Sequence, residues 1–114
     1  LDTENFDYGS LFGITFGMDK AQRIETFDSG STHAMTLTAV DLDKDGKPVK
    51  WKVENSWGAD NGFGGCFIMT DRWFRDYMFR LVVNKEYVPE NLLREFDQKP
   101  VMVMPEDPLF AEDM

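Results

Sequence analysis

Residues 31–58 read STHAMTLTAVDLDKDGKPVKWKVENSWG, and this stretch decides the fold of the chain. Residues 35–40 and 49–54 both alternate apolar and polar side chains, which is the pattern of strands with one face in a core. The Asp45-Gly46 pair between them is the strongest short-range hairpin signal. The stretch therefore predicts a β-hairpin. The apolar positions of its second strand are Val49, Trp51 and Val53.

The outer ends of this hairpin carry His33, the one histidine of the chain, and Asn55. Pairing the strands around the turn brings these ends together, so we expect the two side chains to touch. An imidazole works as a general base only when one ring nitrogen faces the nucleophile and the other is held in the right tautomer. The Asn55 oxygen can accept the second ring N–H, and the Trp57 indole can cover that hydrogen bond against water. A lone histidine is more often structural, but this pairing favours a catalytic role.

Outside the hairpin, local patterns predict short elements separated by loops. Asp19 is a suitable N-cap for a brief helix at 18–25, where Ala, Gln and Arg favour helix. The other expected elements are an irregular lead-in at 1–13, a strand at 66–70, one helical turn at 71–78 capped by Asp71, a strand at 79–84, a helix at 89–98 with Pro89 in its first turn, and an extended tail at 101–114. The sum is a β-rich α+β chain.

Charge and composition exclude several classes of partner for this segment. The formal net charge is −9 and no basic stripe is present, which argues against contact with nucleic acid or an anionic membrane. No apolar run approaches the roughly 18 to 20 residues that span a bilayer. One cysteine leaves no internal disulfide framework and fits a reducing compartment or simple disuse. The start at Leu1 has neither an initiator Met nor a leader layout, which indicates a chain cut from a longer one.

Five segments, in order, resemble the bleomycin hydrolase and aminopeptidase C branch of the papain-like cysteine peptidases. They are DYGSLFGITFGMDKAQRI (7–24), STHAMTLTAV (31–40), KWKVENSWG (50–58), MTDRWFRDYMFRLVVN (69–84) and VPENLL (88–93). The resemblance spans nearly the whole chain. It implies an α+β chain that is the C-terminal, β-rich and barrel-like lobe of the papain-like cysteine proteinase fold. Residues 1–104 would form this lobe, and residues 105–114 a C-terminal arm.

The resemblance also implies roles for three residues of the hairpin ends. His33 resembles the catalytic histidine, which forms a thiolate–imidazolium pair with a cysteine. Asn55 resembles the residue that orients the ring, and Trp57 the indole that shields the contact. The nucleophile and the glutamine of the oxyanion hole belong to the family's N-terminal lobe, which this sequence lacks. Cys66 follows His33 instead of preceding it and has no glutamine nearby, so we expect a half-buried core residue there.

The last ten residues form the part of the chain that departs most from the family. In the bleomycin hydrolase branch the C-terminal arm lies in the active-site cleft, and its terminal carboxylate meets the α-ammonium group of the substrate. The Asp107-Pro108 step is shared with that arm, whereas Glu106 replaces the usual aromatic residue. The acidic end, Glu112, Asp113 and the Met114 carboxylate, would still attract an amino terminus. The alternative is a tail without fixed structure.

The resemblance implies that the parent protein is a cysteine aminopeptidase that hydrolyses N-terminal peptide bonds. The chain alone is expected to be inactive, because a base without its nucleophile contributes little. No metal or other cofactor is implied. The expected partners are a peptide substrate, the N-terminal lobe of the same parent, and further copies in a hexamer, with the parent in the cytoplasm.

Two alternatives remain from other functional classes. The first is a non-catalytic papain-like module with an interaction or inhibitory role. The second is calcium binding, since DLDKDG matches the opening of a calcium loop with Asp41, Asp43 and Asp45 as ligands. That loop needs a glutamate where Lys52 stands and helices on both sides, whereas the flanks here alternate as strands. The pattern therefore favours a solvated hairpin tip.

Overall fold

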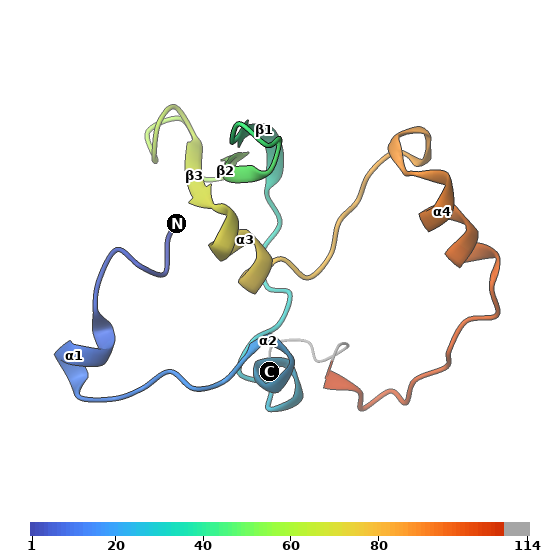
Figure 1. Ribbon diagram of the computed structural model, residues 1–114, viewed down its shortest axis with the longest axis horizontal. Helices are drawn as coiled ribbons and strands as arrows, with labels where there is room; N and C mark the ends of the chain where they lie inside the picture. Colours follow the sequence, from blue (N-terminus) through green and yellow to red (C-terminus); the bar gives the residue numbers. More distant parts are fainter. Residues whose placement is uncertain (109–114) are drawn as a thin grey trace.

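The computed structural model describes residues 1–108, and its centre is a three-stranded antiparallel sheet (Figure 1). The strands are β1 (Thr36–Leu42), β2 (Pro48–Glu54) and β3 (Cys66–Thr70), in the order β1-β2-β3. β1 and β2 form the predicted hairpin, in which Thr36 lies opposite Glu54 and Val40 opposite Trp51. β3 pairs with the other edge of β2. The central strand is therefore the one that leads into Asn55.

The side chain of Asp43 fixes the hairpin turn. Its Oδ1 atom accepts hydrogen bonds from the backbone N–H groups of Asp45 (2.8 Å) and Lys47 (2.9 Å). Gly46 has a φ of 76°, in the left-handed region that glycine enters without a steric penalty. The turn forms where the sequence predicts it because this chemistry is local.

One face of the sheet carries a small core. Val53 is 1% exposed and Met69 is 3% exposed, and Trp51 lies opposite Met69 on the same face. The helix α3 (Asp71–Tyr77) covers this face, where the ring of Phe74 stacks on Trp51 with the centroids 4.7 Å apart. The predicted inward side of β2 is thus confirmed for Trp51 and Val53.

The cap of α3 differs from the prediction. The Thr70 hydroxyl, and not the Asp71 carboxylate, accepts a hydrogen bond from the Trp73 N–H at 3.2 Å. Asp71 instead accepts from Trp51 Nε1 at 2.9 Å and forms an ion pair with Arg75 at 2.6 Å. With seven residues, α3 is longer than the single turn expected. It is the longest helix of residues 1–108, and no helix there is long and apolar enough to cross a membrane.

Two short helices precede the sheet, α1 (Tyr8–Phe12) and α2 (Lys20–Glu25). α2 begins at the predicted cap, since the Asp19 side chain accepts from the Gln22 N–H and the Gln22 side chain accepts from the Asp19 N–H. This reciprocal capping satisfies two backbone donors that the helix leaves unpaired. α1 is capped by Asp7, and hydrogen bonds from the hydroxyl and the amide of Ser10 lower the pKa of that carboxyl group.

The segment at 79–84 corrects a prediction, because it forms no strand with any other part of residues 1–108. Its β-branched residues favour an extended backbone, but a strand also needs a neighbouring edge to pair with. Val82 is accordingly 98% exposed. The elements that follow are η1 (Lys85–Tyr87), α4 (Glu90–Leu93) and η2 (Arg94–Asp97). The helix expected at 89–98 is therefore one α-helical turn that continues as 3₁₀ helix, with Pro89 at its N-cap.

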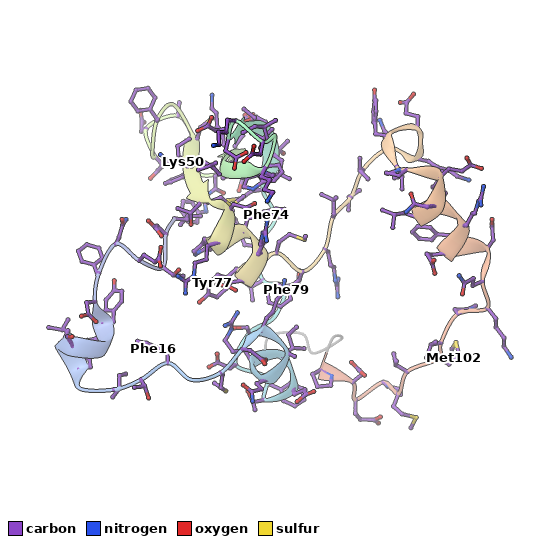
Figure 2. The ribbon with its side chains drawn as sticks, viewed as in Figure 1. Phe16, Lys50, Phe74, Tyr77, Phe79 and Met102 are labelled. Atoms are coloured by element: carbon purple, nitrogen blue, oxygen red, sulfur yellow. The ribbon has the colours of Figure 1, made fainter. Side chains whose placement is uncertain are left out.

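The described chain is open. Its sheet does not close into the expected barrel within residues 1–108, although the expected mixture of helices and antiparallel strands is present. The chain exposes 9955 Å², whereas a compact monomer of this mass exposes about 6,400 Å². Its radius of gyration is 17.0 Å, against about 13 Å for a compact domain of this length. Residues 78–104, which include α4, form a wide loop that extends away from the sheet (Figure 1). Met102 lies in this loop and Phe16 lies in a second open segment, between α1 and α2 (Figure 2).

Replacing Trp51 with phenylalanine removes the indole N–H that binds Asp71 while the ring that stacks on Phe74 remains. Asp71 keeps Arg75 as a partner, so we expect the free energy of unfolding of the full-length protein to fall by about 1 kcal/mol. Urea unfolding followed by circular dichroism measures the change. Trp73→Phe is the matched control, because within residues 1–108 the Trp73 indole N–H makes no hydrogen bond. If both variants lost the same free energy of unfolding, the smaller ring, and not the missing hydrogen bond with Asp71, would explain the effect.

Candidate functional site

His33 and Asn55 meet at one end of the sheet, as the hairpin register predicts. His33 lies three residues before β1 and Asn55 directly after β2, and the first residue of β1 pairs with the last of β2. The His33 Nε2 atom lies 2.7 Å from the Asn55 Oδ1 atom. The backbone N–H of Asn55 donates to the Gly65 carbonyl at 3.0 Å, so the residue is also fixed to the loop before β3.

The tautomer of His33 follows from a backbone hydrogen bond. The Ser56 N–H donates to Asn55 Oδ1 at 2.8 Å, so the amide of Asn55 must present its oxygen at this point. An amide oxygen only accepts hydrogen bonds, and His33 Nε2 must therefore carry the proton that it shares with Asn55. The Nδ1 atom remains as the proton acceptor of the neutral ring. Within residues 1–108 no group forms a hydrogen bond with Nδ1.

Trp57 lies against the ring of His33. The ring centroids are 5.5 Å apart and the planes are inclined by 32°. Trp57 also packs against Phe67 in a T-shaped arrangement, with the ring centroids 5.9 Å apart and the planes inclined by 82°, and Phe67 lies opposite Val53 in the sheet. The Asn61 side chain donates to the Trp57 carbonyl at 2.7 Å. Trp57 is 61% exposed, so most of its surface remains accessible beside the imidazole.

Cys66 stands at the same end of the sheet but on the other face. Successive side chains of a strand point to opposite faces. Phe67 lies on the face of Trp57 and His33, and Cys66, its neighbour in β3, therefore points away from them. The Cys66 thiol is free and half-buried, as the sequence predicts, but it lies on the face opposite the core of Val53 and Met69.

A shallow hollow borders the His33–Asn55 pair. Its lining residues are Ala34, Met35, Thr36, Glu54, Asn55 and Ser56. His33 itself is exposed and Asn55 is half-buried, so the imidazole is reachable from outside this chain. The arrangement offers a ring with a fixed tautomer, an open nitrogen and an aromatic cover. These are the requirements of a general base that acts on a group supplied from elsewhere.

The acidic turn gathers no metal ligands. The Asp43 carboxylate accepts hydrogen bonds from two backbone N–H groups of its own turn. Asp41 is part of β1 and lies opposite Lys50 of β2. Across residues 1–108, no three His, Cys, Asp or Glu side chains lie together as a metal site requires. The calcium alternative gains no support from this geometry.

The two predicted recognition residues of the tail, Asp113 and Met114, lie outside the described residues. Three contributors to the site were not predicted: the Ser56 N–H, the Asn61 side chain and Phe67. A backbone N–H leaves no signal in a sequence. Phe67 belongs to a predicted strand, but residues 66–69 are all apolar, so the sequence did not indicate which of these side chains faces the site.

Comparisons with known proteins give consistent matches. The model of the Peptidase C1-like family matches residues 1–110. Aminopeptidase C of Lactobacillus delbrueckii subsp. lactis is 43% identical over 114 residues, and bleomycin hydrolase of Rattus norvegicus is 43% identical over 113 residues. The crystal structure of PepW from Lactobacillus rhamnosis HN001 superimposes with a TM-score of 0.84 at 45% sequence identity.

These matches cover almost all of this chain but a minor part of each relative. The coverage is 97% and 96% of this chain for the two sequences and 97% for the structure, and 25% of each of the three relatives. The chain therefore spans about a quarter of the length of the proteins that it matches.

Proposed function

This chain belongs to the Peptidase C1-like family, and from this membership we propose that it is the base-carrying C-terminal part of a cysteine aminopeptidase. The observation that carries the proposal is the 2.7 Å contact of His33 Nε2 with Asn55 Oδ1, whose oxygen is oriented by the Ser56 N–H. The family membership supplies the reaction class, and the contact supplies the group that this chain contributes. The cysteine nucleophile belongs to the rest of the parent protein.

The geometry of His33 fits both proton transfers of acyl transfer. His33 Nδ1 takes the proton of the cysteine thiol, and the resulting thiolate forms a bond to the carbonyl carbon of the substrate. The imidazolium then gives that proton to the leaving amine as the peptide bond breaks. Water hydrolyses the acyl-enzyme by the same route, with His33 as base toward water. Asn55 holds Nε2–H throughout, so the ring keeps Nδ1 directed at the reacting atoms.

Substrate selection by an amino terminus forms the second part of the proposal. The similarity to aminopeptidase C supports it, because an aminopeptidase acts at the amino terminus of its substrate. In this chain the carboxylates of Asp113 and Met114 would meet the α-ammonium group of the substrate. We propose that Glu106 adds to the negative charge along the arm.

We further propose that the parent protein assembles from several copies, as a hexamer, in the cytoplasm. The free thiol of Cys66 is compatible with a reducing compartment. The many exposed apolar side chains support burial against further protein, either the rest of the parent or another copy.

Asn55→Ala in the full-length protein tests the central contact. Without the amide oxygen the ring of His33 can rotate, and we expect kcat for an aminoacyl p-nitroanilide to fall by about ten- to a hundredfold. Asn55→Asp keeps an acceptor oxygen at the same place and is expected to fall less. Steady-state kinetics at several pH values measures both variants.

Asn84→Ala serves as the matched control, because the Asn84 side chain makes no capping hydrogen bond at the start of η1. It should leave kcat unchanged. Equal activity of the Asn55→Ala variant and this control would refute the orienting role of Asn55.

A further inference from the structure

His33 lies in a segment that contains no regular secondary structure. After α2 the chain passes through residues 26–35 before it enters β1, and residues 30–35 have neither helix nor strand. The Asn55 contact holds the imidazole tip, but it cannot place the backbone from which the side chain extends. Another part of the molecule must fix this segment if His33 is to keep one position.

Arg23, in α2, holds the beginning of the segment through its backbone. Its carbonyl oxygen accepts hydrogen bonds from the N–H groups of Asp28 (2.8 Å) and Ser29 (3.1 Å). Between them and the helix, Phe27 has a φ of 60°, which a non-glycine residue adopts only where its surroundings enforce it. The turn that sends the chain toward His33 is therefore anchored on Arg23.

The side chain of Arg23 holds a different element. Its Nη2 atom donates to the Asp76 carbonyl at 2.9 Å, and its guanidinium lies over the Tyr77 ring at 4.9 Å. Both residues belong to the C-terminal turn of α3. Arg23 thus binds α3 through its side chain and the start of the His33 segment through its backbone carbonyl group.

Lys20, one turn earlier in α2, reinforces the same contact. Its ammonium group donates to the Arg75 carbonyl at 2.8 Å and to the Met78 carbonyl, and it lies over the Phe79 ring at 5.1 Å. The last carbonyl groups of a helix have no partner within the helix and favour a cation. Figure 2 shows Tyr77 and Phe79 beside the lower end of α3, close to α2.

α3 also contacts the strand that carries Asn55. α3 is fixed to β2 by the hydrogen bond of Trp51 with Asp71 and by the stack of Trp51 on Phe74. β2 leads directly to Asn55, which binds His33. α3 is therefore connected to His33 through α2 and to Asn55, the orienting residue, through β2.

We infer that Arg23 and Lys20 are positioning residues for His33: they lock α2 onto the C-terminal end of α3 and so hold the backbone that carries the general base. The inference rests on the proposed function for its catalytic consequence, but its structural part stands without it. Neither residue touches the reacting atoms.

The test uses the full-length protein with Arg23→Met, and with Lys20→Met as a milder variant that retains the Arg23 anchor. Arg94→Met is the matched control, since Arg94 pairs only with the exposed Glu90 within residues 1–108. Hydrogen–deuterium exchange reports on the backbone of residues 28–35. We expect exchange there to accelerate by about tenfold in Arg23→Met, less in Lys20→Met, and not in the control.

The pH profile of kcat/KM is the second readout, because a purely structural role would not move it. A displaced imidazolium stabilises the thiolate less, which raises the pKa of the nucleophilic thiol. The acidic limb of the profile should therefore move to higher pH and the active range should narrow, with KM little changed. Lys20→Arg, which keeps a cation for the carbonyl groups, should restore the profile that Lys20→Met loses.

The outcomes separate this inference from the proposed function. Unchanged exchange at residues 28–35 in both methionine variants would overturn it, as would faster exchange with an unaltered pH profile. If Arg23→Met fails to fold, Lys20→Met and Lys20→Arg decide in the same way. A wild-type protein without peptidase activity would refute the proposed function, and exchange alone would then decide whether α2 holds the His33 segment.

Discussion

Replacing His33 with alanine in the full-length protein will lower kcat/KM for an aminoacyl substrate by about a thousandfold or more. In the proposed mechanism, loss of the imidazole leaves the thiol with neither a base to remove its proton nor a cation beside its thiolate, and leaves the departing amine without a proton donor. KM should change little, since in the proposed mechanism His33 acts on the reacting atoms and does not bind the rest of the substrate. Single-turnover and steady-state kinetics give both quantities.

The control for His33→Ala is Lys47→Ala, at the hairpin tip on the far end of the same two strands. It should retain full activity. If His33→Ala kept kcat/KM within about threefold of the wild type, His33 would not be the base, and the non-catalytic module would become the better account.

The isolated 114-residue chain will not unfold as a stable, cooperative monomer. Val53 and Met69 are the only apolar side chains of residues 1–108 that are fully buried, and the chain exposes 9955 Å². The excess over a compact monomer is about 3,500 Å², and leaving that much surface in water costs more than the roughly 5 to 15 kcal/mol by which a folded domain is stable. We expect a broad urea transition with no folded baseline, and self-association in sedimentation velocity.

The full-length protein, studied in the same buffer, provides the comparison and should give a steep transition. A monodisperse 13.2 kDa monomer with a free energy of unfolding above about 5 kcal/mol would contradict this prediction. It would also remove the need for the rest of the parent to complete the core.

The elements that the sequence predicted correctly are those with local causes. The β1–β2 hairpin combines a turn that Asp43 and Gly46 close by themselves with strict alternation in β2. The cap of α2 is equally local, since Asp19 and Gln22 are three residues apart. The meeting of His33 with Asn55 followed from the hairpin register, which the turn determines.

The predictions that failed depended on distant partners. Residues 79–84 have strand-forming side chains, but whether they pair depends on an edge that this part of the chain does not supply. For α3, two adjacent residues are both good caps, and Trp51 Nε1, twenty residues away, engages Asp71 and leaves the cap to Thr70. The clamp of Arg23 and Lys20 on α3 is of the same kind, since its acceptors are backbone carbonyl groups that no motif marks.

The most direct test of the account is to label the full-length protein with a thiol-directed peptidase inactivator and to locate the label by peptide mapping. The account predicts rapid labelling of one cysteine upstream of this chain, no label on Cys66, and a large loss of labelling rate in His33→Ala. Label on Cys66, or a rate that does not depend on His33, would contradict the claim that this chain supplies the base to a nucleophile outside it.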